Sequence, residues 1–452
     1  MSKRKGCLVP SWFENNDSFD NVRIAVCDLN GVLRGKRLPS GGIEKLFEDG
    51  SRMPLSTSCI DIWGADLINS PFLFNTGDAD GKVIPTGTEL IPVNWLDRAT
   101  AVLPAWMSDE NNIPSPIDPR QILNSVVEKY LAIGLKPVVA FELEFYLLDS
   151  QSNQPIVTQN PLTGNRLMRT SVLSIDELDS FENFFSDVCV ACEDHNIPSD
   201  TVISENGVGQ FEINLKHTSN SLVAADNAVF FKRIVRGVAQ KHALKASFMA
   251  KPFLDMAGNG MHLHMSVIDS AGINIFDSKN HTGSKILKNA IGGLIDSMKE
   301  STLIFAPHLN SYRRLKPGSH APTAVCWGYE NRTASIRIPG GEPENTRIEH
   351  RVAGADANPY LVAATVLSAV LNGIEKEIKA PNPLDGDSYE SNCEQIPSDW
   401  KTAIDVFRSG NLNKKFFTET FIEVFSNLKS QELRTFANRM EDFEIMSYLD
   451  AV

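Results

Sequence analysis

The chain has 452 residues, of which 56 are acidic and 43 are basic, so its formal net charge is −13. Hydrophobic residues make up 42% and charged residues 22%, which is typical of a globular protein with a large buried core. The acidic balance excludes nucleic acid and anionic membrane as main partners, because both require a basic surface. The length predicts roughly two to four domains.

The compartment is indicated by the cysteines and by the apolar segments. Seven cysteines are scattered along the chain, an odd number that favours a reducing cytoplasm over a disulfide framework. Cys189 and Cys192 form a C-x-x-C pair inside a stretch with a helical pattern, where we expect them to pack in the core. Residues 1–13 lack the apolar core of a secretory leader, and the apolar run 360–371 is too short to span a bilayer. We therefore expect a cytoplasmic protein without a membrane span.

The first 105 residues have the pattern of short strands and turns. Val22–Leu29 alternates and leads into an Asn30-Gly31 turn followed by a second strand at 32–37, which predicts a β-hairpin. The Pro-rich stretch 109–119 marks a boundary, which we place so that one domain covers 1–112 and a second covers 113–452.

The second domain begins with a capped helix and then mixes helices with strands. Asp118-Pro119 starts a helix that runs to about residue 133. Between the later helices lie strand-like segments, so we expect an α+β domain. The later helices are expected at 178–194, 221–244, 284–302, 358–377, 398–409 and 414–440.

Five of the expected strands alternate apolar with polar side chains, which places each set on one face. A sheet with one face in water alternates in the same way. The polar positions lack lysine, however, and lysine is common on solvated faces, so we favour a shared polar site. These positions are Glu142 and Glu144; Gln210, Glu212 and Asn214, with Glu205 upstream; His262, His264 and Ser266; Ser335 and Arg337; and Arg347, Glu349 and Arg351.

This combination of side chains favours metal and phosphate chemistry. A cluster of carboxylates repels itself unless cations neutralise it, and glutamate oxygens with imidazole suit Mg²⁺ or Mn²⁺. Metals beside arginines are what phosphoryl transfer needs, but the sequence has no P-loop or kinase motif. A two-metal phosphoryl-transfer enzyme and a metal-dependent hydrolase both remain open from the residues alone. The arginines are Arg313, Arg314, Arg332, Arg337, Arg347 and Arg351.

Six motifs together resemble those of the glutamine synthetase family. They occur in the family's order and at compatible spacing, covering about 110–450, and D-x-N-G-x-x-R-G-K at 28–36 adds weaker support. The motifs are F-E-L-E-F-Y-L (141–147), S-E-N-G-V-G-Q-F-E-I-N (204–214), G-N-G-M-H-L-H-M-S (258–266), N-S-Y-R-R-L-K-P-G (310–318), N-R-T-A-S-I-R-I-P (331–339) and R-I-E-H-R-V (347–352).

The resemblance implies a fold, an assembly and a reaction. It implies an N-terminal β-grasp domain and a catalytic domain with a curved antiparallel sheet. The neighbouring subunit would complete each active site in a homo-oligomer, commonly a dodecamer of two stacked hexameric rings. In the implied reaction, the γ-carboxylate of L-glutamate attacks the γ-phosphate of ATP. A nitrogen nucleophile then displaces phosphate from γ-glutamyl phosphate.

The resemblance also assigns roles to individual residues of this chain. Two metal sites, two substrates and the transferred phosphate would share one funnel. One metal would be held by Glu144, Glu205 and Glu212, and the other by Glu142, His262 and Glu349. The ATP site would be lined by His264, Ser266, Arg337 and Arg347, and the transferring phosphate would be met by Arg332. Glutamate would be bound by Gly258, Arg314 and Arg351.

The chain departs from the family's pattern around the nitrogen nucleophile. Ammonia-using members carry a glutamate in the loop where this sequence has His320, which would act as the catalytic group here. Leu55 replaces an aspartate that helps to bind ammonium, and Ala257 replaces an asparagine. A neutral imidazole accepts a proton but supplies no fixed negative charge for a small cation. Alternatively, His320 is simply an exposed residue of a divergent loop.

These departures favour the branch of the family that makes γ-glutamyl amides of organic amines. Glutamine synthesis from ammonia remains an alternative. A non-catalytic member is a weaker one, because such a protein should have lost metal ligands. The acceptor stays open: Leu55, Ile60 and Trp63 suit an alkyl or aryl amine, whereas Asp61, Asp78 and Asp80 suit the distal ammonium of a diamine. Tyr389 lies near a position that some bacterial members adenylylate, but we expect an ordinary loop tyrosine there.

Overall fold

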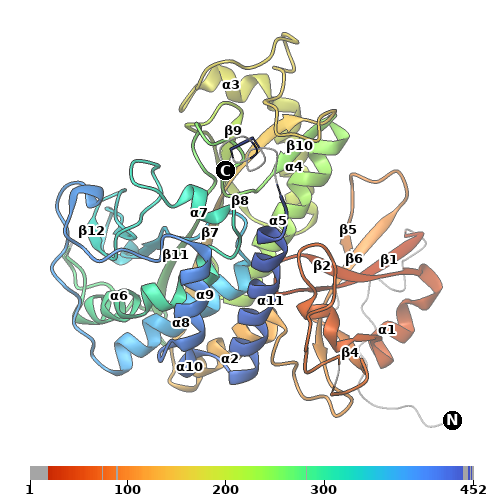
Figure 1. Cartoon of the computed structure of the whole chain (residues 1–452), viewed down its shortest axis with the longest axis horizontal. Coiled ribbons are helices and arrows are strands. Elements are labelled where there is room, and N and C mark those ends of the chain that lie inside the picture. Colours follow the sequence, from red (N-terminus) through yellow and green to blue (C-terminus); the bar gives the residue numbers. More distant parts are fainter. Residues whose placement is uncertain are drawn as a thin grey trace.

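The computed structural model describes residues 19–440, except 74, 88, 89 and 281, together with 446, 447 and 449. Residues 1–13, where the sequence lacks a leader core, lie outside the described residues. Figure 1 shows a smaller N-terminal sheet beside a larger unit of sheet and helices. No helix in the described part of the chain is long and apolar enough to cross a membrane.

The N-terminal sheet has the strand order β2-β1-β6-β4-β3, and β5 pairs with β6. β1 and β6 run parallel, while β1 and β2 form the predicted antiparallel hairpin, with Gly31 at a positive φ of 76° in its turn. The elements are β1 Asn21–Cys27, β2 Leu33–Pro39, α1 Ile43–Asp49, β3 Ser51–Pro54, β4 Asp80–Pro85, β5 Ile91–Pro92 and β6 Thr100–Ser108.

Strand β1 contributes to two hydrophobic cores. Val22, Ile24 and Val26 point into a small core that includes residues of α1. Ala25 and Cys27 point to the opposite face and belong to the main core of the molecule. Because successive side chains of a strand alternate between faces, this one strand joins the N-terminal unit to the rest of the chain.

The large sheet has the order β12-β13-β14-β11-β7-β9-β8, and β10 pairs with β7. Its strand pairs are antiparallel as predicted, except that β12 and β13 run parallel. The strands are β7 Lys136–Asp149, β8 Ser199–Ser204, β9 Gln210–Leu215, β10 Leu244–Ser247, β11 Met261–Ile268, β12 Trp327–Tyr329, β13 Ile336–Ile338 and β14 Ile348–His350.

Helices pack on the apolar side of this sheet, where Phe141, Leu143 and Phe145 of β7 are fully buried. Helices α2 and α5 contact β7, and α8 packs against α2, α5 and α6. The helices are α2 Pro119–Ala132, α3 Ile175–Ser180, α4 Glu182–Asp194, α5 Ser221–Lys241, α6 Lys285–Phe305, α7 Ser311–Arg314, α8 Pro359–Glu375, α9 Trp400–Ser409, α10 Asn413–Phe416 and α11 Glu419–Ala437.

Two helices that the sequence predicts as continuous are each divided in two. The stretch predicted at 178–194 starts earlier and breaks at Phe181, between α3 and α4. The stretch predicted at 414–440 breaks where Phe417 is extended, with φ −126° and ψ 161°, and the Thr418 side chain then caps α11 through the backbone N–H of Phe421. Apolar periodicity continues across both breaks, so it does not reveal them.

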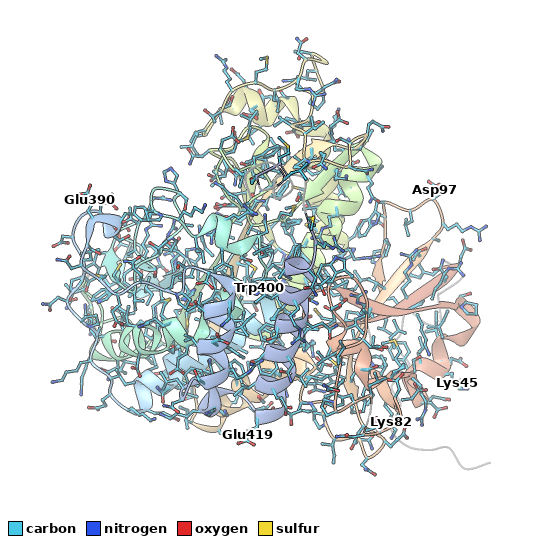
Figure 2. All side chains as sticks on the ribbon, viewed as in Figure 1. Lys45, Lys82, Asp97, Glu390, Trp400 and Glu419 are labelled. Carbon is cyan, nitrogen blue, oxygen red and sulfur yellow. The ribbon has the colours of Figure 1, made fainter. Side chains whose placement is uncertain are left out.

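Helix α11 lies against the N-terminal unit (Figure 1), and Figure 2 places Glu419 at its start and Trp400 of α9 beside it. The contact contains a buried Lys429–Glu432 network, in which the Nζ and Oε2 atoms lie 2.9 Å apart and both side chains are fully buried. Glu432 Oε1 accepts hydrogen bonds from Asn30 Nδ2 at 3.1 Å and from the Ile62 N–H at 2.9 Å. Lys429 also donates to Asn30 Oδ1.

The C-x-x-C pair lies on α4. Cys192 is buried in the main core and Cys189 is half-buried. Burial raises the pKa of the Cys192 thiol to about 12. A thiol that stays protonated and packed is typical of a core residue, which agrees with the packing interpretation.

Candidate functional site

The polar face of the large sheet is assembled by cross-strand register around β7. Glu142 lies opposite His262 of β11, and Glu144 lies opposite Glu212 of β9. On the far side of β11, Glu349 of β14 lies opposite His264. The alternation that the sequence showed in separate segments therefore places these side chains on one surface, as predicted.

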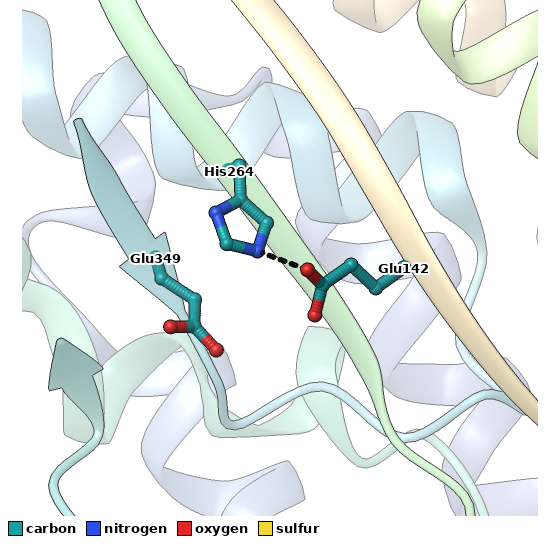
Figure 3. Close-up of side chains that lie close together, drawn as sticks. All are labelled: Glu142, His264 and Glu349. Carbon is teal, nitrogen blue, oxygen red and sulfur yellow. Dashed lines mark ion pairs between the residues drawn. The ribbon is translucent and has the colours of Figure 1, made fainter. Parts of the chain in front are cut away.

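Glu142 is at the centre of the closest contacts. His264 Nε2 lies 2.8 Å from Glu142 Oε1, and Figure 3 shows both side chains turned toward Glu349. His262 Nδ1 lies 3.2 Å from Glu142 Oε2 and 3.7 Å from Glu349 Oε1. Glu142, His264 and Glu349 form one group whose ligand atoms lie within 4.8 Å of one another, and Glu142, Glu212 and His262 form another.

Glu144 and Glu205 lie at the edge of this cluster. Glu144 Oε2 accepts hydrogen bonds from the Gly260 N–H at 2.7 Å and from Gln210 Nε2 at 3.4 Å. Glu205 follows β8, and its pKa is raised to about 7, first by burial and then by the charge of Glu144. Among the described residues, the predicted metal ligands Glu144, Glu205 and Glu212 do not form a group whose ligand atoms all lie within 4.8 Å of one another.

Burial and neighbouring charges raise the pKa of some carboxylates in the cluster and lower the pKa of others. Burial, followed by repulsion from Glu142 and Glu144, raises the pKa of Glu212 well above its ordinary value. Burial also opposes ionisation of Glu349, but Arg351 and His262 outweigh it and lower the pKa of Glu349 to about 2. A bound cation stabilises the charged form of carboxylates that repel one another, and this donor set of carboxylate and imidazole fits Mg²⁺ or Mn²⁺.

Arginines border the carboxylates on the β13 and β14 side. Arg337 Nη1 donates to Glu349 Oε2 at 2.8 Å, and its Nη2 donates to Glu330 Oε2 at 3.0 Å. Arg351 also pairs with Glu349, and Arg347 Nε lies 3.3 Å from His264 Nδ1. Cations and carboxylates therefore alternate across the surface, which suits a substrate that carries several negative charges.

Two glycines leave room for the Arg314 side chain close to His262 and Glu144. Arg314 is buried and donates to the Val352 carbonyl at 2.8 Å. A Cβ on Gly258 would lie 2.8 Å from the Cγ of Arg314, and a Cβ on Gly260 would lie 2.9 Å from both Arg314 Nη2 and His262 Nε2. Any side chain at either glycine would displace these groups, so the backbone itself lines this part of the site.

The remaining predicted residues have weaker ties to the cluster. Arg332 is exposed, but its charge lowers the pKa of Glu205, so its guanidinium acts on the carboxylate group. Ser266 is half-buried on β11, two positions after His264 on the same face. His320 is exposed at a positive φ of 61°, and it makes no hydrogen bond or ion pair within the described part of the chain. Its loop is not held against the cluster by this side chain.

Two residues that the sequence analysis named without giving them a role in the site, Gln210 and Tyr389, help to organise it. Gln210 Nε2 donates to the Gly258 carbonyl at 3.0 Å and to Asn259 Oδ1 at 2.9 Å, and its place in the polar alternation was the signal for it. Tyr389 donates its hydroxyl to the Ala321 carbonyl at 2.9 Å, next to His320. Burial raises the pKa of Tyr389 while Arg314 and Arg351 oppose that rise, so its hydroxyl lies within their field.

The N-terminal acceptor candidates differ in how their charges are used. The Asp61 carboxylate is buried and accepts from the N–H groups of Trp63 at 3.0 Å and Ala65 at 2.8 Å. Asp78 accepts from the Ser56 hydroxyl at 2.7 Å, whereas Asp80 is exposed. Asp61 therefore closes its own loop, and Asp80 is the freest of the three predicted carboxylates.

Comparisons with known proteins identify close relatives of the whole chain. Residues 116–448 match the family model described as "Glutamine synthetase, catalytic domain". Gamma-glutamylputrescine synthetase PuuA of Escherichia coli K12 is 36% identical over 97% of this chain and 93% of its own length. Glutamate–isopropylamine ligase of a Pseudomonas species is 30% identical, with 97% of each chain covered. Among solved structures, "Apo GmaS without ligand" superposes with a TM-score of 0.85 at 28% identity, covering 97% of this chain and 99% of that one.

Proposed function

Because the chain belongs to the glutamine synthetase family, we propose that it is an ATP-dependent carbon–nitrogen ligase that joins the γ-carboxylate of L-glutamate to an organic amine. It has that family's mixed α/β fold with curved sheets. The relatives named above are an enzyme of γ-glutamylputrescine synthesis and a glutamate–isopropylamine ligase, both of which join glutamate to an amine. The observation that carries the proposal is the cluster of carboxylates and histidines around Glu142, which Arg337 and Arg351 border through Glu349. It is supported by His320, which stands where ammonia-using family members carry a glutamate.

The first step would be supported by charges on the large sheet. Arg337 and Arg347 would bind ATP beside His264 and Ser266, and Arg332 would stabilise the charge on the transferring phosphate. Mg²⁺ or Mn²⁺, when held by Glu142, Glu144, Glu205, Glu212, His262 and Glu349, would neutralise charge on the phosphates.

Glutamate would be oriented from the side of the buried arginine. Arg314 and Arg351 would pair with its carboxylates, and the backbone at Gly258 would accept from its amino group. This placement brings the γ-carboxylate toward the carboxylate-rich face, where ATP is bound. Gln210 would keep the Gly258 carbonyl in position through the hydrogen bond described above.

In the second step, His320 would accept a proton from the attacking amine. The hydrogen bond from Tyr389 to the Ala321 carbonyl would keep that loop near the glutamate arginines. Leu55 and Trp63, presented by a neighbouring copy, would offer apolar surface to an alkyl or aryl amine. A diamine would instead place its distal ammonium at Asp80, since Asp61 is occupied by its own loop.

The same proposal includes the organisation of the chain. We propose an N-terminal β-grasp domain at 1–112 and a catalytic domain at 113–452, supported by the parallel β1–β6 pair with its flanking antiparallel strands. We further propose a cytoplasmic dodecamer of two stacked hexameric rings, with active sites between subunits. Light scattering coupled to size exclusion would test the assembly.

The experiment that tests the function is phosphate release from ATP with Mg²⁺ or Mn²⁺ and glutamate. The acceptors are ammonium, methylamine, isopropylamine, ethanolamine, putrescine, spermidine and aniline, each with a control lacking glutamate. We expect strong activity with one organic amine and little with ammonium. Preference for ammonium would make the protein a glutamine synthetase, and no activity with any acceptor would indicate a non-catalytic member.

A further inference from the structure

A cavity lies between the N-terminal sheet and helix α5, and none of the site residues proposed above lines it. Its volume is about 270 Å³. In Figure 1 the β1–β2 hairpin lies beside α5. Residues of both elements line the cavity. The hairpin contributes Gly31–Leu33, and the segment between β5 and β6 contributes Trp95. Helix α5 provides the charged wall, with Lys232, Arg233 and Arg236.

The cations of this wall have no carboxylate partners. In the described part of the chain, none of the three makes an ion pair within 4.0 Å, and the Nε of Arg233 is buried without a hydrogen-bond partner. They contact aromatic rings and a carbonyl instead. Arg233 lies 5.5 Å from the Trp95 ring, Arg236 lies 5.1 Å from the Phe248 ring, and Lys232 Nζ donates to the Ala357 carbonyl at 3.3 Å.

A buried arginine elsewhere in the protein shows the contrast. Arg120 is also largely buried, but it makes a two-point ion pair with Asp226, with both distances 2.9 Å. Burial lowers the pKa of Arg120 and Asp226 raises it, with a net rise. At Arg233, burial and the charge of Arg23 both lower the pKa, and no carboxylate raises it. The chain thus supplies a counter-charge for Arg120 but not for Arg233.

Lys232 is the most buried of the three cations, and it too lacks a carboxylate partner among the described residues. Burial, then repulsion from Arg236, lowers its pKa to about 7, although Asp356 acts in the opposite direction. Asp356 accepts a hydrogen bond from the Ser311 hydroxyl at 2.6 Å, so part of its capacity is used elsewhere. Positive charges that repel one another beside an open cavity are stabilised when an anion enters the cavity.

We propose that this cavity binds a small molecule with two or more negative charges, carried by phosphate or carboxylate groups. Two arginine guanidinium groups pair geometrically with either group, and the Trp95 ring offers a flat apolar surface to the rest of the molecule. The volume lies just below the range of about 300–1,000 Å³ typical of small-molecule sites, so the ligand is a compact metabolite rather than a nucleotide or polymer. The site is separate from the proposed ATP and glutamate positions and does not depend on the proposed reaction.

The test uses the intact protein and a matched pair of variants. Arg233→Met with Arg236→Met removes both charges while keeping the side-chain stems against Trp95 and Phe248. Arg169→Met removes one exposed charge that forms no ion pair among the described residues and does not line the cavity. Inorganic phosphate and citrate are titrated separately by calorimetry, so that the phosphate and carboxylate alternatives are distinguished. Crystals soaked in tungstate, a heavy-atom analogue of phosphate, locate the site by anomalous scattering.

We expect the double variant to weaken binding of the preferred anion by about tenfold or more, whereas Arg169→Met leaves it unchanged. Tungstate should lie between Trp95 and the two arginines. Equal affinity in wild type and double variant, or tungstate confined to the large sheet, would overturn the proposal. The proposal would also be overturned if tungstate did not enter the cavity of the assembled protein and the double variant had an altered oligomeric state. That result would assign the charged wall to contact with a second copy of the chain. If the double variant does not fold, Arg236→Met alone is tested, because that residue is exposed.

Discussion

Buried charges occur both in the contact between α11 and the N-terminal unit and on the large sheet, but they are compensated differently. In the first region, the fully buried Glu432 forms an ion pair with Lys429 and accepts hydrogen bonds from Asn30 and the Ile62 N–H. Its negative charge is therefore compensated within the chain. On the large sheet, neighbouring glutamates raise the pKa values of Glu205 and Glu212, whereas His262 and His264 lower that of Glu142, so only some of the carboxylates are compensated.

The difference separates a structural role from a functional one. A buried charge that is closed by its own chain fixes the geometry of a contact, and removing one partner leaves the other uncompensated. A group of carboxylates that lacks sufficient internal partners destabilises the free protein and becomes favourable only when cations bind. Variants in the two regions should therefore have opposite signatures in activity and stability.

The largest expected effect is the loss of ligation in Glu144→Ala. A metal ligand serves the first chemical step, so activity with every amine should fall by at least about 1,000-fold, equivalent to about 4 kcal/mol. Because the substitution also relieves repulsion within the cluster, the melting temperature without metal should stay the same or rise.

Glu128→Ala, at an exposed position of α2, is the matched control and should keep full activity. Turnover retained by Glu144→Ala in the phosphate-release assay would contradict the metal assignment. A large loss of folding in the same variant would instead give this glutamate the structural role that we assign to the Lys429–Glu432 network.

The next largest effect is on stability, from Lys429→Met. The substitution leaves Glu432 buried without its cation and should lower the stability of the folded protein by about 3–5 kcal/mol. Denaturant unfolding measures this loss. Replacing both partners with apolar residues, as Lys429→Met and Glu432→Leu, should recover part of it; a single variant as stable as wild type would contradict the comparison.

Divalent metal should act only on the carboxylate region. Mn²⁺ at about 100 times its dissociation constant should stabilise the wild type by about 2.7 kcal/mol, because it binds the folded state alone. Glu142→Ala, which alters the carboxylate shared by both close groups, should lose most of this gain in a thermal shift assay. Lys429→Met should keep it, and an equal loss in both variants would argue against a local metal site.

The smallest expected effect concerns the acceptor. His320→Glu should increase the ratio of kcat/KM for ammonium to that for the preferred amine by about tenfold, or about 1.4 kcal/mol, because it restores a negative charge for a small cation. His320→Gln is the control, because glutamine has the same side-chain length as glutamate but no charge. An unchanged ratio in His320→Glu would mean that this loop does not select the acceptor.

Much of the site could be predicted because strands translate sequence spacing directly into faces. Alternation placed Glu142, Glu144, Glu212, His262 and Glu349 on the polar faces of their strands, and the lack of lysine at these positions favoured one shared site. The register of β7, β9, β11 and β14 brings these positions side by side. The β1–β2 hairpin and the start of α2 were likewise local signals, carried by Asn30-Gly31 and Asp118-Pro119.

The rest depends on contacts between distant segments. The close groups share Glu142 because of side-chain orientation, which alternation does not determine. Tyr389 reaches Ala321 across 68 positions, and Glu330 meets Arg337 from a turn with a positive φ of 52°; neither carries a local pattern. The parallel β12–β13 pair and the breaks before α4 and α11 were missed for the same reason.

Strand β1, with one side in each hydrophobic core, has a consequence for how the protein unfolds. If the N-terminal unit detached, Ala25 and Cys27 would leave the main core, and removing the whole strand would also open the small core around Val22 and Ile24. The two units should therefore melt together in a single calorimetric transition. A chain shortened to residues 113–452 would expose the apolar surface that β1 now covers, and we expect it to aggregate instead of forming an independent module.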